Sequence, residues 1–170
     1  MSDSTQPQLI QATQLDDFFH HAVRDAAHEA KLIADAATLH YLSSLLCCYA
    51  RSERVFDYAE NRLQLRPLAL LYGEALEASS PSERNLWLQR LGDLALFVGG
   101  LFSGRMHRHF QDLDYCVAMG GNAYGYLQQS AIHPNEMAQA TVFGELAERF
   151  VHFVDLVAVV TGRQPEHLDA

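Results

Sequence analysis

The segment from Pro81 to Gln129 constrains the fold most, because it combines helix-compatible apolar spacing with seven of the chain's ten glycines. Gly121 and Gly125 lie four residues apart and therefore on one face of a helix. A glycine has no side chain, so a second backbone or a flat ligand can come very close to that face. We therefore predict close helix packing at four glycines: Gly100, Gly104, Gly121 and Gly125.

Apolar residues recur at three- and four-residue steps along most of the chain, a spacing typical of amphipathic helices. Helices are predicted over 14–31, after Asp35, and over 67–78, 81–103, 114–130 and 135–161. The first two predicted helices are also compatible with one long helix that bends. The charges of residues 51–65 alternate in sign, which is compatible with an exposed helix or an ordered connection. No alternating β-branched run favours a strand.

These patterns predict an all-α fold, a single-domain bundle of five or six helices over residues 13–162. Residues 1–12 are predicted to form a flexible tail and residues 163–170 a loose one. Ser80 to Glu83 is the strongest helix start, with Ser80 as the cap, Pro81 in the first turn and Glu83 reaching back to the cap.

Charge and apolar runs limit the possible partners. The net charge of −9 argues against general nucleic-acid binding and against binding to anionic membranes. The most apolar run, Leu94 to Phe102, is nine residues long, whereas a membrane span needs about 20. Met1 to Gln8 lacks the basic and apolar regions of a signal peptide. We therefore expect a cytoplasmic protein without a membrane partner.

The three cysteines are Cys47, Cys48 and Cys116, without a C-x-x-C pair. The side chains of neighbouring helical residues point about 100° apart, so Cys47 and Cys48 are not expected to coordinate the same metal ion. They are predicted to be small core residues in a reducing compartment.

A cationic cluster follows the glycine-rich helix, and two arginines and two histidines in it are suited to binding phosphate or carboxylate. An alternative is favourable charge near a helix C-terminus. The glycines also leave space for a flat cofactor such as haem, and the hydroxyl groups of nearby tyrosines are available to form hydrogen bonds with it. The candidate ligand-binding residues are Arg105, His107, Arg108, His109, Tyr115, Asn122 and Tyr124.

The last predicted helix carries Glu145, Glu148, His152 and Asp155 at steps of three and four residues. Such spacing is compatible with a metal, but the ligands of di-iron bundles project inward. On a helical wheel these four residues lie opposite the apolar face, so they are predicted to point to solvent or to a partner. We assign no metal ligand.

Four short motifs share a pattern: Gly92-Asp-Leu-Ala-Leu-Phe97, Gly100-Leu-Phe102, Asp114-Tyr115 and Gly121-Asn-Ala-Tyr124. The pattern resembles one in small bacterial all-helical proteins of unassigned function. The resemblance implies a bacterial source and no activity, cofactor or site residue.

Because the chain has no recognisable catalytic constellation, we predict a non-enzymatic helical interaction or regulatory protein. It is expected to self-associate, as a homodimer, or to bind a protein partner. The alternative is an enzyme or sensor that binds a small anionic or flat ligand, including haem or a metal, beside the glycine-rich helices. Sequence alone assigns no cofactor and no catalytic residue.

Overall fold

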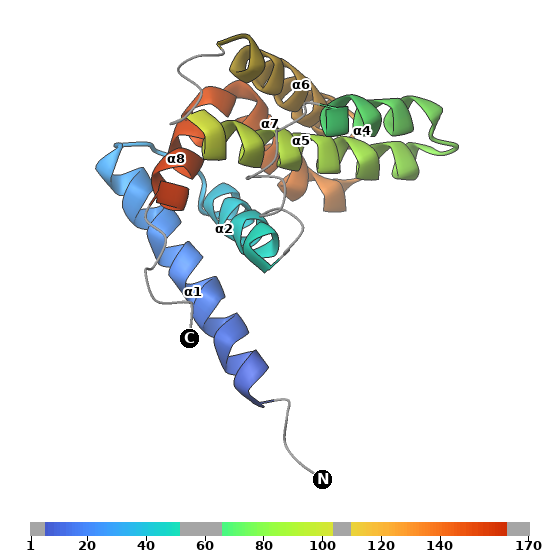
Figure 1. Ribbon diagram of the computed structural model, residues 1–170. Helices are drawn as coiled ribbons and strands as arrows, with labels where there is room; N and C mark the ends of the chain where they lie inside the picture. The colour runs from blue at the N-terminus through green and yellow to red at the C-terminus, as the bar shows by residue number, and fades with distance from the viewer. Residues whose placement is uncertain (1–5, 52–65, 104–109, 163–170) are drawn as a thin grey trace.

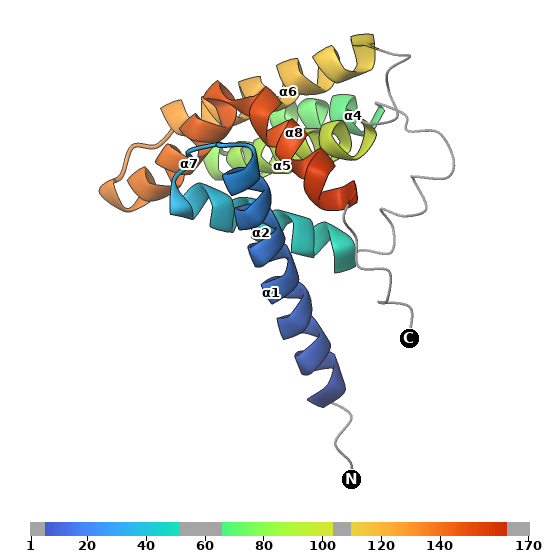
Figure 2. The same cartoon turned by 90° about the vertical axis from the view of Figure 1, so that its left-hand side faces the viewer.

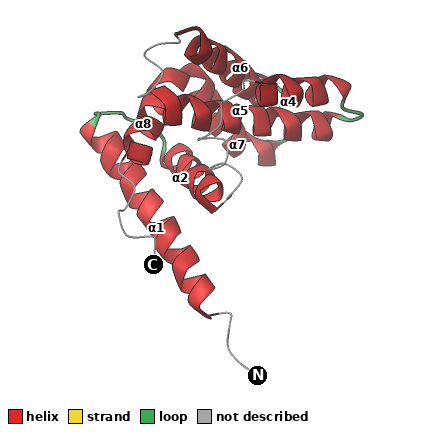
Figure 3. Cartoon of the chain, viewed as in Figure 1, coloured by secondary structure: helices red, strands yellow, loops and turns green. Residues whose placement is uncertain are grey.

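A computed structural model describes residues 6–51, 66–103 and 110–162 (Figure 1). Within these ranges the chain forms seven α-helices, one 3₁₀ turn and short connections (Figure 3). The elements are α1 (Gln6–Glu29), α2 (Ala36–Arg51), α4 (Arg66–Glu77), α5 (Pro81–Ser103), α6 (Phe110–Gln129), η1 (Pro134–Glu136), α7 (Met137–Glu148) and α8 (Phe150–Gly162). The all-α prediction is confirmed, but the bundle has seven helices where five or six were expected.

Helix α5 is the centre of the arrangement (Figure 1). It packs against α6 and α8, and α4 covers another of its sides. Helices α1 and α2 form a hairpin that packs against α8 and α7. Figure 1 shows α4 and the start of α5 on one side of the molecule, and both views show α1 projecting away from the other helices (Figure 2).

Helix α1 begins at Gln6, inside the segment predicted to be a flexible tail. The capping pattern at Thr13 therefore lies within the helix. From residue 13 onward, Phe19 is the first buried side chain of α1, while Leu15 and Phe18 are partly buried against the core. Both views show the earlier turns of α1 extending away from the rest of the molecule.

Helices α1 and α2 are separate helices, because the chain reverses between them at Lys31, which has a φ of 54°. The Leu32 N–H donates to the Ala27 carbonyl at 2.9 Å, and the Lys31 N–H donates to the His28 carbonyl at 3.1 Å. This pair of bonds is a Schellman helix end with lysine at the left-handed position. Asp35 then caps α2, since its carboxylate accepts the Ala37 N–H at 2.9 Å.

The predicted helix 135–161 is divided at Arg149 into α7 and α8, which accounts for the seventh helix. Arg149 has φ −120° and ψ 33°, outside the helical region. Its guanidinium donates to the Ile33 carbonyl in the α1–α2 loop and to the Glu145 carboxylate. The change of direction lets α7 pack on α6 while α8 packs on α5.

The start of α5 follows the sequence prediction closely. The Ser80 hydroxyl accepts the Glu83 N–H at 3.2 Å. The Glu83 carboxylate accepts the N–H of Ser79 at 2.9 Å, one residue before the predicted partner. These bonds satisfy N–H groups that have no partner inside the helix.

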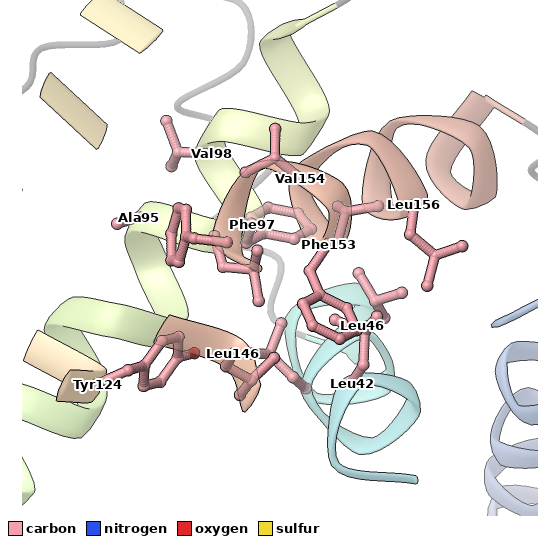
Figure 4. Packing of buried hydrophobic residues seen from close by; sticks show 14 of the residues in the cluster. Leu42, Leu46, Ala95, Phe97, Val98, Tyr124, Leu146, Phe153, Val154 and Leu156 are labelled. Atoms are coloured by element: carbon pink, nitrogen blue, oxygen red, sulfur yellow. The ribbon is translucent and has the colours of Figure 1, made fainter. Parts of the chain in front are cut away.

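The core lies where α2, α5 and α8 meet (Figure 4). Leu42 and Leu46 of α2 face Phe153 of α8, and all three are almost completely buried. The same cluster continues through Leu96 of α5 and Leu146 of α7. One continuous apolar core therefore joins the hairpin to the central helices.

Three glycines are tightly packed against buried side chains. A Cβ added at Gly92 would lie 2.7 Å from Tyr124 Cε1, and one at Gly100 would lie 2.3 Å from Val157 Cγ1. At Gly120 it would lie 2.3 Å from Cζ of Phe150 and 2.9 Å from Cβ of Ala95. Carbon atoms in contact are normally about 3.5–4.0 Å apart, so each position has room only for hydrogen.

Gly121 and Gly125, by contrast, have room for a side chain. The nearest atom to an added Cβ is 3.9 Å away in both cases, and both atoms belong to Ala147. Of the glycines predicted to pack closely, Gly100 is crowded. The crowding expected at Gly121 and Gly125 is found instead at Gly92 and Gly120, because side chains of neighbouring helices lie over those two positions. Gly104 lies outside the described residues.

Two alanine substitutions in α6 separate crowding from helix propensity. Alanine is favoured over glycine inside a helix by about 1 kcal/mol, so Gly125→Ala should raise the free energy of unfolding by up to that amount. Gly120→Ala should be less stable than Gly125→Ala by about 1–3 kcal/mol, because its methyl group overlaps Phe150. Urea unfolding followed by circular dichroism measures both; equal stabilities would contradict the packing described above.

Candidate functional site

Asp93, in the middle of α5, is a largely buried carboxylate held by two tyrosines. Its Oδ1 atom accepts a hydrogen bond from the Tyr41 hydroxyl of α2 at 2.6 Å. The same atom accepts one from the Tyr124 hydroxyl of α6 at 2.7 Å. Helices α2, α5 and α6 therefore meet at one oxygen atom.

Gln89 extends this network by one turn of α5. Its Nε2 atom donates to the Tyr41 hydroxyl at 3.0 Å, so the Tyr41 hydroxyl accepts from Gln89 and donates to Asp93. We refer to Asp93, Tyr41, Tyr124 and Gln89 as the Asp93 cluster.

Aromatic rings surround the Asp93 cluster. Phe143 of α7 lies edge-on to Tyr41, with ring centroids 5.7 Å apart, and stacks on Tyr124 at 5.6 Å. Tyr49 of α2 stacks on Phe97 of α5 at 4.5 Å. The contacts with Phe143 hold the rings of Tyr41 and Tyr124, whose hydroxyl groups are directed at the carboxylate.

Burial raises the pKa of Asp93, although the hydrogen bonds from Tyr41 and Tyr124 act in the opposite direction. Burial, with the Asp93 charge as the next cause, raises the pKa of both tyrosines. The tyrosines therefore remain protonated donors at neutral pH. The arrangement is suited to holding a buried carboxylate in place.

A cavity of about 240 Å³ opens next to the Asp93 cluster, between the start of α5, the end of α6 and the start of α7. Gln89 and Phe143 belong to its wall as well as to the surroundings of Asp93. Its wall consists of Ser82, Asn85, Leu86, Gln89, Leu127, Ser130, Ala131, Glu136, Gln139, Ala140 and Phe143.

The acidic face predicted on the last helix is only partly solvent-facing. Glu145 points toward the start of α2, where its carboxylate accepts the Asp35 N–H at 3.1 and 3.2 Å and the Thr38 hydroxyl at 2.7 Å. The reason is the α1–α2 loop, which brings these donors next to α7. Glu148, His152 and Asp155 are exposed. In the described ranges, no three His, Cys, Asp or Glu side chains are arranged to hold a metal ion.

The candidate ligand-binding residues have different outcomes. Arg105, His107, Arg108 and His109 lie outside the described residues. Tyr115 is partly buried against the core and Asn122 is exposed. Tyr124 is fully buried and belongs to the Asp93 cluster.

Sequence reasoning missed Asp93, Tyr41 and Gln89. One signal was present, because Asp93 is the only charged residue between Arg90 and Arg105 in an otherwise apolar stretch. A carboxylate in a buried helix needs hydrogen-bond donors.

Two of the three cysteines lie in the core. Cys47 and Cys116 are buried, whereas Cys48 is exposed. The Cys47 thiol donates to the Asp16 carboxylate at 2.8 Å. Burial, and then this hydrogen bond, raise the pKa of Cys47 to about 11, so at neutral pH Cys47 is a protonated thiol.

Comparison of the chain with protein-family models, curated proteins and solved structures finds no match. Among the described helices, none combines the length and the apolar character that crossing a bilayer requires.

The raised pKa of Asp93 predicts a pH-dependent stability. Between the unfolded pKa, about 3.9, and the higher folded pKa, the folded state binds more protons than the unfolded state. The contribution of Asp93 to stability is therefore complete below the unfolded pKa and is lost as the pH rises through the folded pKa. We expect Asp93→Asn, which keeps an oxygen acceptor for both tyrosines, to gain stability relative to the wild type as the pH rises.

Urea unfolding of both proteins over a pH series from about 4 to 7 measures this difference. Asp114→Asn removes the same charge from an exposed position on α6 and serves as the control. A difference between wild type and Asp93→Asn that stays constant with pH, or changes in the opposite direction, would show that the Asp93 pKa is not raised.

Proposed function

We propose that the protein is a non-enzymatic helical interaction protein that self-associates through an apolar surface at one end of the bundle. The single observation that carries this proposal is the distribution of exposed apolar side chains. In the described part of the chain, ten large hydrophobic residues are exposed, and seven of them belong to α4, α5, α6, η1–α7 and the connection before η1. We name these seven the apolar end: Leu70, Tyr72, Leu76, Leu86, Tyr126, Ile132 and Met137.

Contacts between these elements support treating the seven as one surface. Helix α4 packs on α5, and the Arg84 guanidinium of α5 lies 3.4 Å from the Tyr126 hydroxyl of α6, to which it donates. Leu86 lines the same cavity as Ala131 and Glu136, the sequence neighbours of Ile132 and Met137. Figure 1 shows α4 and the start of α5 together, away from α1 and α8.

Exposed apolar side chains that gather on one face are typical of protein interfaces. A second copy of the chain is the partner that fits this surface, because a twofold axis brings the same apolar residues together. Each copy also carries a net charge of −9, so association has to proceed through a face where apolar burial outweighs charge repulsion.

The non-enzymatic part of the proposal is supported by the Asp93 cluster. The Asp93 carboxylate accepts hydrogen bonds from two tyrosine hydroxyls and joins three helices. Its position is that of a structural link in the core.

Replacing Leu70 and Leu76 with aspartate tests the surface. Their side chains are 68% and 64% exposed, so the substitutions should leave the fold intact. Two charges inside an apolar interface are costly, so we expect the wild type to sediment as a dimer and Leu70→Asp/Leu76→Asp as a monomer.

The matched control is Val151→Asp/Val159→Asp on α8, which also replaces two exposed apolar residues of one helix. It should remain dimeric. A wild type that is monomeric at micromolar concentration, or a control that dissociates as completely as the α4 variant, would rule out the apolar end as the self-association surface.

A further inference from the structure

We propose that the cavity beside the Asp93 cluster binds a small uncharged molecule that carries both hydrogen-bond donors and hydrogen-bond acceptors. This inference goes beyond self-association, and the cavity shares one residue, Leu86, with the apolar end. The proposal rests on the chemistry of the cavity wall.

Amide and hydroxyl groups from three helical elements converge on the cavity. Asn85 and Gln89 come from α5 and Gln139 from α7, while Ser82 and Ser130 come from the start of α5 and the end of α6. Amide side chains have donors and an acceptor; the Gln89 amide already donates once, to Tyr41. The Ser130 hydroxyl already donates to the Leu127 carbonyl at 3.1 Å and is therefore left as an acceptor. A ligand with only donors or only acceptors leaves some of these groups without a partner, which is costly in a partly buried site.

Apolar side chains form the rest of the wall. Leu127 of α6 and Ala140 and Phe143 of α7 are almost fully buried. Small-molecule sites typically combine such an apolar surface with a few fixed polar groups. The volume of about 240 Å³ is below the range of about 300–1,000 Å³ for drug-sized ligands. The cavity therefore suits a smaller molecule.

The charge of the wall favours an uncharged ligand. Glu136 is the one ionisable residue of the wall, and its carboxylate accepts the N–H groups of Ile132 and His133 at 3.0 and 3.3 Å. These bonds lower the pKa of Glu136, so an anionic ligand meets a like charge. The carboxylate is also exposed, so solvent screening weakens its effect on a ligand of either sign, and it does not offset the hydration that a charged ligand loses in the cavity.

Gln89 connects the cavity to the interior. It lines the cavity and donates to the Tyr41 hydroxyl, which in turn donates to Asp93. The rotamer of Gln89 is thereby fixed before a ligand arrives, which reduces the entropy that binding costs. A ligand that bonds to Gln89 becomes the next member of the hydrogen-bond chain.

N-Acetylglucosamine is a suitable probe, because it is uncharged and has one amide and several hydroxyl groups. At roughly 0.3 kcal/mol for each of its about 15 heavy atoms, the expected dissociation constant is on the order of 1 mM. Titration into ¹⁵N-labelled protein, followed by NMR, should shift the side-chain amide signals of Asn85, Gln89 and Gln139. The side-chain amide of Gln14, on α1, is the internal reference and should not move.

Gln139→Leu removes one amide of the wall and leaves the Asp93 cluster intact, so we expect it to weaken binding at least tenfold with an unchanged melting temperature. Gln14→Leu is the matched control and should bind as the wild type does. N-Acetylglucosamine 6-phosphate should bind more weakly than the uncharged sugar.

Three results would overturn the proposal. The first is the absence of shifts at all three wall amides, and the second is unchanged binding by folded Gln139→Leu. The third is binding of the phosphorylated sugar as tight as or tighter than that of N-acetylglucosamine. The titration repeated on Leu70→Asp/Leu76→Asp separates this site from self-association, because the cavity wall is unchanged in that variant.

Discussion

The hydrogen bonds from Tyr41 and Tyr124 to Asp93 are the interaction on which the arrangement of the helices depends. A carboxylate inside an apolar core costs several kcal/mol unless donors surround it. Here the donors come from α2 and α6, and the acceptor comes from α5. Because hydrogen bonds weaken steeply with distance and angle, they fix the position of α2 along the central helices. Apolar packing alone tolerates a shift between helices; this contact does not.

The crowded glycines and the Asp93 cluster belong to the same constraint. Gly92 directly precedes Asp93, and the Tyr124 ring lies where a Cβ of residue 92 would be, 2.7 Å from Cε1. Only glycine at position 92 lets the ring come close enough to α5 for its hydroxyl to reach the carboxylate at 2.7 Å. The helix propensity lost at Gly92, about 1 kcal/mol, is offset by satisfying a buried charge.

The sequence was sufficient for features that depend on neighbouring residues. Helical periodicity predicted the elements, and the starts at Asp35 and Ser80 were predicted correctly because a cap bonds to N–H groups two or three residues away. The division at Arg149 was missed, since the apolar spacing continues from Phe143 to Val157 and the guanidinium bonds to Ile33, which is 116 residues away. The direction of Glu145 was missed for the same reason, because its donors lie on the α1–α2 loop and in the first turn of α2.

The glycines and Asp93 show where pattern reasoning reaches its limit. Spacing singled out Gly121 and Gly125, but packing depends on which side chain lies opposite, and there it is the small Ala147. The position of Asp93 in an apolar stretch indicates a buried carboxylate, yet its partner Tyr41 is 52 residues away on a different helix. Residue spacing within one helix contains no information about such a partner.

The two proposals meet at Leu86, which lines the cavity and belongs to the apolar end. Ile132 and Met137 lie directly before and after the segment 133–136, and Glu136 of this segment lines the cavity. A second copy that covers these side chains also changes the access of solvent to the cavity. Two binding events that share a surface are thermodynamically linked, so a ligand in the cavity and a second copy at the apolar end change each other's affinity by the same factor. Gln89 lines the cavity and is joined to the core by its hydrogen bond to Tyr41, which donates to Asp93. These bonds hold the cavity wall in place relative to the core.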